Sequence, residues 1–199
     1  MSYLSVGLVA TLWCVFAASA WSKLRSRAAQ RAFADSLRPL PLLPGRLVGP
    51  AAAAVTGAEA AIVLGLGWSL VAALAGWPGA RAVATLVLLV TSLLLAVLTT
   101  GVVLAVRRRT GARCACFGAA ERPLGRRHVV RNGLLLAGVA VGLVDAIVGS
   151  AHRPAPAGAA VAVLAGVLGA AVLIRLDDLV ELFLPIGTAP PAAPTHHET

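Results

Sequence analysis

Two cysteines separated by a single residue, Cys114 and Cys116, are the positions of this sequence best suited to chemistry. Cysteines at i and i+2 of a loop can bring their Cα atoms within the distance that a disulfide allows, and so tight a ring is easily reduced. Arg113 precedes the pair, and nearby cations stabilise the thiolate that attacks disulfides. Gly118 permits a backbone turn just after it. The spacing therefore predicts a pair that exchanges thiols and disulfides.

Two other interpretations of the same pair stay open. The cysteines could be half of a metal site that His128 and Cys14 complete, although their spacing matches no standard zinc pattern. They could also be two small residues without chemistry, as we expect for the isolated Cys14. On balance the sequence predicts neither a bound metal nor another cofactor.

The composition indicates that membrane helices must position these cysteines. Of 199 residues, 59% are hydrophobic and 13% are charged, and the mean hydropathy is +0.88. A soluble domain is about half apolar and about a quarter charged, and a disordered chain is poor in apolar residues. Three cysteines are also too few for a disulfide-stapled secreted scaffold. An integral membrane protein remains.

Five apolar segments are long enough, or nearly so, to cross about 30 Å of hydrocarbon as helices. They are residues 3–21, 48–75, 82–106, 129–149 and 158–174, of which the last is the weakest. No period-two alternation supports a β-barrel. We predict an all-α polytopic transmembrane helical bundle with four core spans and a fifth, in one domain over residues 1–187. The tail, residues 188–199, is predicted to be disordered.

Positive charge is concentrated in two stretches and predicts the topology. The net charge is +9, and 13 of the 17 Lys and Arg residues fall within residues 22–46 and 107–127. Basic loops mark the cytoplasmic side of a membrane protein, so we expect both loops in the cytoplasm and the N-terminus outside the cell membrane. The first span lacks a basic N-terminal region, so we expect it to be retained rather than cleaved. No groove-reading motif accompanies the charge, which excludes nucleic acid as a partner and leaves the lipid bilayer.

Glu59 is the one acid well inside an apolar span, where a charge costs roughly 2.5–3.5 kcal/mol at the bilayer centre. It should face the bundle and find a partner, for which Lys23 and Arg131 are candidates. Such a residue can be a proton site or a ligand contact, or it can simply pair two helices. Asp145 is expected at the membrane interface.

Residues 22–37 place apolar side chains near one helical face and cations on much of the rest. This pattern predicts either a short amphipathic helix among the lipid headgroups or an extension of the first span. Pro39, Pro41 and Pro44 then break the helix. Gly138 and Gly142 form a small-xxx-small pair that we assign to packing within the molecule.

The run from Cys114 to Leu135, CACFGAAERPLGRRHVVRNGLL, resembles the signature of the methylamine-utilisation MauE family, which are small DoxX-like membrane proteins. The resemblance covers roughly residues 1–150, including the Ser-Lys-Leu sequence after the first span, Pro44 and Glu59. The residues that match the signature are Cys114, Cys116, Phe117, Gly118, Leu124, Gly125, Arg131 and Asn132.

The resemblance implies thiol–disulfide redox maturation of an exported partner, the disulfide-rich small subunit of periplasmic methylamine dehydrogenase. A thioredoxin-like protein of the MauD type would act alongside. Cys114 and Cys116 would be the redox pair, and Glu59, Arg131 and Asn132 would organise the bundle. The charge pattern places the pair in the cytoplasm, whereas the exported subunit lies outside, so the direction of electron flow stays open.

Two other functions are compatible with the sequence. One is a non-catalytic membrane scaffold or chaperone for the assembly of a partner. The other is a small-solute carrier, although the spans show no evident internal repeat and few polar residues at mid-depth.

Overall fold

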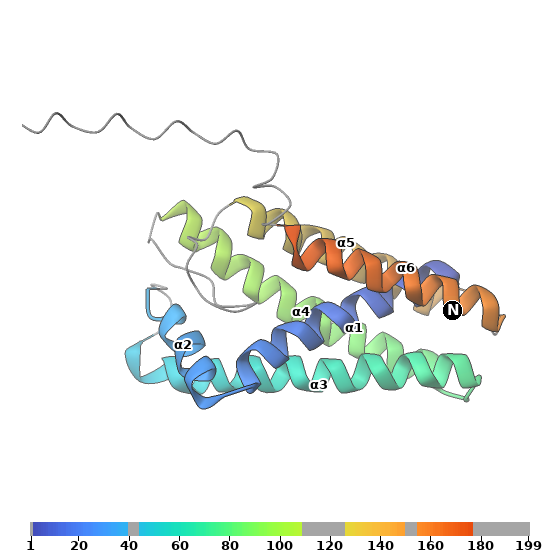
Figure 1. The fold of residues 1–199 in the computed structure, drawn as a ribbon, viewed down its shortest axis with the longest axis horizontal. Coiled ribbons are helices and arrows are strands. Elements are labelled where there is room, and N and C mark those ends of the chain that lie inside the picture. Colours follow the sequence, from blue (N-terminus) through green and yellow to red (C-terminus); the bar gives the residue numbers. More distant parts are fainter. Residues whose placement is uncertain (1, 40–43, 109–125, 150–154, 177–199) are drawn as a thin grey trace, which may run out of the picture.

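The computed structural model describes residues 2–39, 44–108, 126–149 and 155–176. Its helices are α1 (Tyr3–Leu24), α2 (Arg27–Leu37), α3 (Val48–Ala75), α4 (Ala80–Arg107), α5 (Arg126–Val148) and α6 (Pro156–Ile174), with a 3-10 turn η1 (Gly45–Leu47) before α3 (Figure 1). The described ranges contain no strand, and the predicted all-α class is confirmed. The tail 188–199 and the cysteine loop lie outside the described residues.

Five of these helices are long and apolar enough to cross a membrane. They are Tyr3–Leu24, Gly45–Ala75, Ala80–Arg107, Arg127–Val148 and Pro156–Ile174. The polytopic bundle and its fifth span are therefore confirmed. The predicted bounds differ from those of the helices by three residues or fewer, since helix ends depend on capping that hydropathy does not measure.

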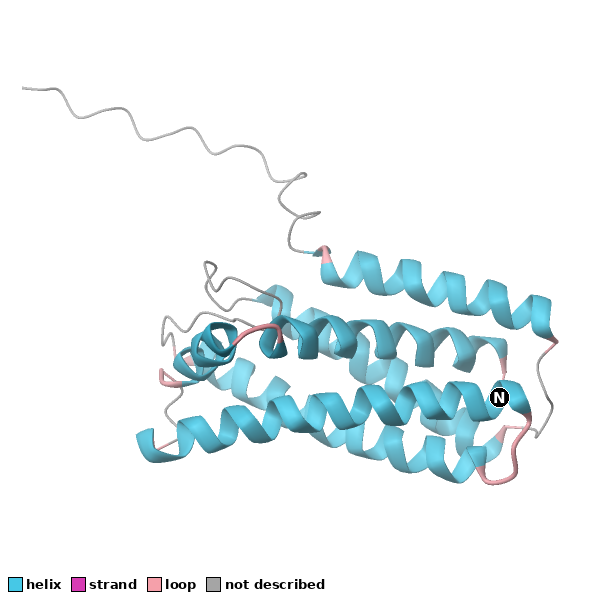
Figure 2. Ribbon diagram, turned by 60° about the horizontal axis from the view of Figure 1, so that its bottom comes forward, coloured by secondary structure: helices cyan, strands magenta, loops and turns pink. Residues whose placement is uncertain are grey.

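Hydrogen bonds between distant segments show how the helices alternate in direction. The Ser2 amide donates to Asp145 Oδ2 at 3.1 Å, and the Arg81 guanidinium donates to the carbonyl oxygen of Ala146 at 3.1 and 3.2 Å. The starts of α1 and α4 and the end of α5 thus meet at one end of the bundle. The end of α1, the start of α3, the end of α4 and the start of α5 gather at the other, where α2 also lies (Figures 1 and 2).

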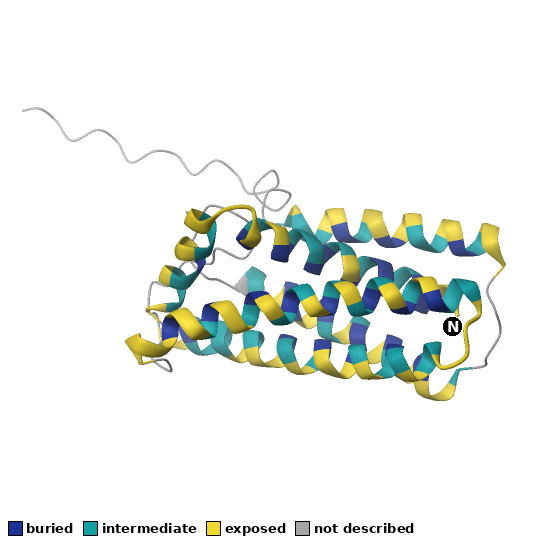
Figure 3. Cartoon of the chain, turned by 90° about the horizontal axis from the view of Figure 1, so that it is seen from below, coloured by how far each residue is buried: buried dark blue, intermediate teal, exposed yellow. Residues whose placement is uncertain are grey.

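The core runs along the middle of the bundle, and α1 lies at its centre, in contact with α3, α5 and α6. Buried positions form stripes along the inward faces of the helices, whereas positions on the outer faces are exposed (Figure 3). Large apolar residues such as Leu64 and Leu93 are exposed on those outer faces, as expected where lipid rather than water is the surrounding solvent. The core consists chiefly of Val9, Leu12, Phe16, Ile62, Leu66, Leu88, Leu95, Leu135 and Val139.

Small residues let three pairs of helices approach closely, α1 with α6, α1 with α5 and α4 with α5. At the α1–α6 contact, Thr11 Oγ1 donates to the carbonyl oxygen of Gly166 at 3.0 Å. On α5, Gly138 faces Leu8 and Gly142 faces Leu88. The predicted assignment of this glycine pair to packing within the molecule is therefore confirmed.

Residues 22–37 form the end of one helix and the whole of a second. Helix α1 ends at Leu24, and Ser26 begins α2 by accepting a hydrogen bond from the Ala29 amide at 3.0 Å. The serine cap makes a break favourable here, since it satisfies a backbone donor that a new helix leaves unpaired. The alternative in which the whole of 22–37 extends the first span is wrong. Helix α2 packs on α1 and α3 through Phe33, which is buried.

Candidate functional site: a buried ion pair beneath α2

Glu59 and Lys23 form an ion pair inside the bundle. Lys23 lies in the last turn of α1, and Glu59 lies in the first half of α3, which runs antiparallel beside it. The Lys23 Nζ atom is 2.7 Å from Glu59 Oε2 and 2.9 Å from Oε1, and the two side chains are 1% and 4% exposed. Buried charges are tolerated when they are paired and hydrogen-bonded, so this contact explains how Glu59 can lie in an apolar helix.

Ser19 completes the set of partners around the ion pair. Lys23 Nζ donates to Ser19 Oγ at 2.7 Å and to the Ser19 carbonyl oxygen at 3.3 Å. Ser19 Oγ in turn donates to Glu59 Oε1 at 3.1 Å. The role of Ser19 was not predicted from the sequence, although the i,i+4 spacing from Ser19 to Lys23 places both residues on one helical face and is a signal for it.

Helix α2 covers the ion pair from the end of the bundle. The Phe33 ring centroid lies 4.8 Å from Lys23 Nζ, a distance suited to a cation–π contact. Thr56 Oγ1, one turn before Glu59, donates to Gln30 Oε1 of α2 at 3.2 Å. The site therefore joins α1, α2 and α3 and shields two charges from solvent.

The other predicted polar residues, Arg131 and Asn132, are also buried, at 8% exposure each. They lie near the start of α5, which packs against α1 and α4. Of the two cations considered for Glu59, the structure pairs it with Lys23. Polar residues buried inside a membrane bundle bind its helices together, and both positions fit that use.

The predicted redox residues Cys114, Cys116 and Gly118 lie outside the described residues. The segment that contains them joins α4 to α5, and Arg108 and Arg126 bound it at the end of the bundle where Lys23 and Glu59 lie. Within the described ranges, no group of three His, Cys, Asp or Glu residues could hold a metal ion. Cys14, one of the ligands considered for a metal, is a partly buried free cysteine packed against the core.

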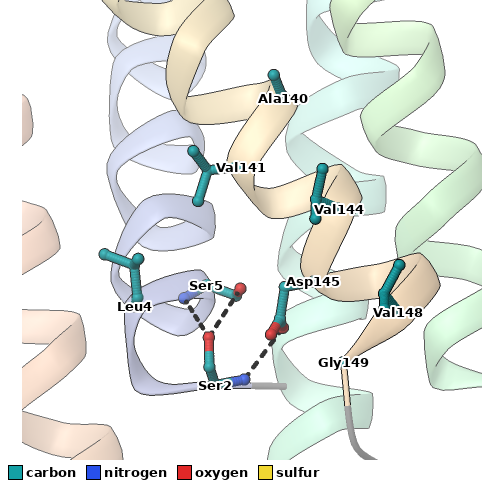
Figure 4. Close-up of a pocket in the computed structure, with 9 residues that line it drawn as sticks. All are labelled: Ser2, Leu4, Ser5, Ala140, Val141, Val144, Asp145, Val148 and Gly149. Atoms are coloured by element: carbon teal, nitrogen blue, oxygen red, sulfur yellow. Dashed lines mark hydrogen bonds between the residues drawn. The ribbon is translucent and has the colours of Figure 1, made fainter.

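A shallow apolar pocket lies at the opposite end of the bundle, between α1 and α5 (Figure 4). Asp145 closes its end by accepting the Ser2 amide hydrogen bond, and Ser5 donates its own amide to Ser2 Oγ at 3.2 Å. Asp145 thus lies in the last turn of α5, at the end of its span, as expected of an interfacial acid. The lining residues are Ser2, Leu4, Ser5, Ala140, Val141, Val144, Asp145, Val148 and Gly149.

Comparison with known proteins gives one result. The family model for the methylamine utilisation protein MauE matches residues 1–145, well over half of the chain. The chain belongs to the MauE family. No curated protein and no solved structure matches it.

The MauE match includes the buried ion pair, Arg131, Asn132 and both cysteines of the C-x-C pair. It extends from α1 to Asp145 in the last turn of α5. Helix α6 lies beyond the match and packs on the outside of α1. The chain is therefore an integral membrane protein of the MauE type, and α6 follows the matched region.

Proposed function

We propose that this protein supports thiol–disulfide redox maturation of an exported partner and that Cys114 and Cys116 are its redox pair. The observation that carries the proposal is the MauE match, whose range contains both cysteines. By the family resemblance, the partner is the methylamine dehydrogenase small subunit or a thioredoxin-like protein of the MauD type. A thiolate of the partner attacks the disulfide between Cys114 and Cys116, and a mixed disulfide forms as one of these two cysteines leaves as a thiolate. A second thiolate of the partner then displaces the other cysteine, so the partner gains a disulfide while Cys114 and Cys116 are both reduced to thiols.

The described residues supply two features that support this chemistry. Arg107 and Arg108 at the end of α4 are exposed, and Arg127 lies at the start of α5, so the cysteine segment is bounded by cations that favour thiolate. The Lys23–Glu59 pair joins α1 to α3 at the same end, which holds that end of the scaffold in place. Glu59, Lys23, Arg131 and Asn132 serve in this proposal as structural residues rather than as redox groups.

A non-catalytic scaffold or chaperone is the second candidate. The observation in its favour is that Glu59 accepts hydrogen bonds from both Lys23 and Ser19, as a residue that binds helices together would. In this case the cysteines would be dispensable, whereas the buried ion pair would be essential.

Replacing both cysteines, Cys114→Ser with Cys116→Ser, separates the two candidates. We expect oxidation of the partner to fall to background while the amount of membrane-inserted protein stays unchanged, because only the sulfurs are removed. The measurement is alkylation of the partner's free thiols followed by gel shift. Cys14→Ser is the matched control and should retain activity. Full partner oxidation in the double variant would refute the redox proposal and support the scaffold.

We also propose that the N-terminus lies outside the cell membrane and that loops 22–46 and 107–127 lie in the cytoplasm. The exposed arginines at one end of the bundle support this orientation by the positive-inside rule. We expect a membrane-impermeant maleimide to label Cys114 and Cys116 in inside-out vesicles and not in intact cells, in a Cys14→Ser background. Labelling of Cys114 or Cys116 in intact cells would contradict this orientation and indicate the opposite one.

A further inference from the structure

The outer surface of α2 and its flanking residues carries more positive charge than the acid described there can neutralise. Five arginines between Leu24 and Leu47 are described and exposed: Arg25, Arg27, Arg31, Arg38 and Arg46. The one exposed acid described in that stretch is Asp35, which accepts a hydrogen bond from Arg38 Nε at 2.8 Å. Arg27 and Arg31 lie one turn apart and share a helical face.

This surface also exposes large apolar side chains beside the arginines. Trp21 is 71% exposed, Leu24 is 58% exposed and Leu47 is 46% exposed, and all three lie at the ends of membrane spans. Tryptophan and leucine flanked by arginine are typical of a helix that lies at the boundary between headgroups and acyl chains. An acidic protein partner would account for the charge but not for the exposed apolar residues at the ends of the spans.

Contacts with the bundle hold α2 against the end of α1 and the first half of α3. Phe33 packs over Lys23, and Gln30 accepts a hydrogen bond from Thr56 of α3. With this face of α2 turned to the bundle, Arg27 and Arg31 remain exposed. Their guanidinium groups can each donate two parallel hydrogen bonds to a phosphate.

We infer that α2 and the residues flanking it form a binding surface for anionic phospholipid headgroups. Arg27 and Arg31 bind the headgroup phosphates, and Trp21 and Leu24 contact the adjoining acyl chains. This inference goes beyond the proposed redox function and does not depend on the cysteines. Each arginine near an anionic membrane surface raises the binding constant about fivefold.

The test uses the full-length protein purified in neutral detergent. Phosphatidylglycerol and phosphatidylcholine with identical acyl chains are added together, and the bound lipids are counted by native mass spectrometry. We expect phosphatidylglycerol to be bound at least tenfold more than phosphatidylcholine, and we expect this preference to weaken as salt is raised. Arg27→Gln with Arg31→Gln should lower phosphatidylglycerol binding at least tenfold and leave phosphatidylcholine binding unchanged.

Arg38→Gln is the matched control, because the Arg38 guanidinium is already paired with Asp35. It should change the preference less than twofold, and all variants should keep the unfolding temperature of the parent protein. Equal binding of the two lipids, or a double variant that binds like the parent, would overturn the inference. If the parent protein shows no lipid preference and Arg27→Gln with Arg31→Gln abolishes oxidation of the partner, the surface binds an acidic protein instead.

Discussion

Glu59→Leu is expected to lower the free energy of unfolding by roughly 3–5 kcal/mol, because it leaves the Lys23 charge buried without its counterion. The Lys23 side chain is 1% exposed and Phe33 packs over it, so the ammonium cannot reach water without displacing α2. Ser19 alone cannot balance a full charge in this setting. We expect less protein in the membrane and a clearly lower unfolding temperature in detergent.

The double variant Lys23→Met with Glu59→Leu tests whether the loss arises from the orphaned charge. Replacing a buried ion pair by apolar residues of similar volume is often neutral, so we expect most of the stability to return. Asp35→Asn is the control for an ion pair in general, since the Asp35–Arg38 pair is 62% and 67% exposed and should contribute at most about 1 kcal/mol. If Glu59→Leu unfolds at the temperature of the parent protein, the ion pair is not what holds α1 to α3.

Gly166→Leu is expected to separate α6 from α1. A Cβ atom at Gly166 would overlap the carbonyl oxygen of Gly7 and lie 2.9 Å from the Ala10 Cβ atom. A backbone oxygen cannot rotate away, so the two helices must move apart. The hydrogen bond from Thr11 to the Gly166 carbonyl oxygen would then be lost as well. Overpacking of this kind typically costs about 1–3 kcal/mol, and a larger side chain adds to it.

Cys14 provides a reporter for this separation. It lies on α1 at the helical spacing that continues Gly7 and Thr11, on the side that faces α6. With Cys114 and Cys116 replaced by serine, Cys14 is the sole thiol of the chain. We expect Gly166→Leu to increase the rate at which an apolar maleimide labels Cys14 in detergent and to lower the unfolding temperature.

The control for this variant is Gly169→Ala in the same helix. A Cβ atom there would lie 3.6 Å from Thr11 Oγ1, which is an ordinary contact. Alanine also favours a helix over glycine, so this change should be neutral or slightly stabilising. Equal labelling rates in Gly166→Leu and the parent protein would show that the α1–α6 contact does not depend on this close approach.

Glu59→Leu and Gly166→Leu probe two contacts that the sequence predicts to different extents. That Glu59 must be buried with a cation follows from one acid in an apolar span, because an isolated charge in hydrocarbon is too costly to persist. The sequence did not determine that Lys23 rather than Arg131 pairs with Glu59. Both cations lie at the same end of the bundle, and hydropathy carries no information about which helices are neighbours. Packing of α3 beside α1 decided it.

The same division holds for the helices. Length and hydropathy alone determined the five spans, because a membrane accepts few backbone arrangements other than a helix of sufficient length. The arrangement of α6 against α1 and of α2 over Lys23 was decided only in the tertiary structure. Both depend on which side chains come within a few ångströms across helices distant in sequence, such as Gly7 with Gly166. Local pattern can predict a helix and its apolar face, but the partner for that face depends on the shape of the whole bundle.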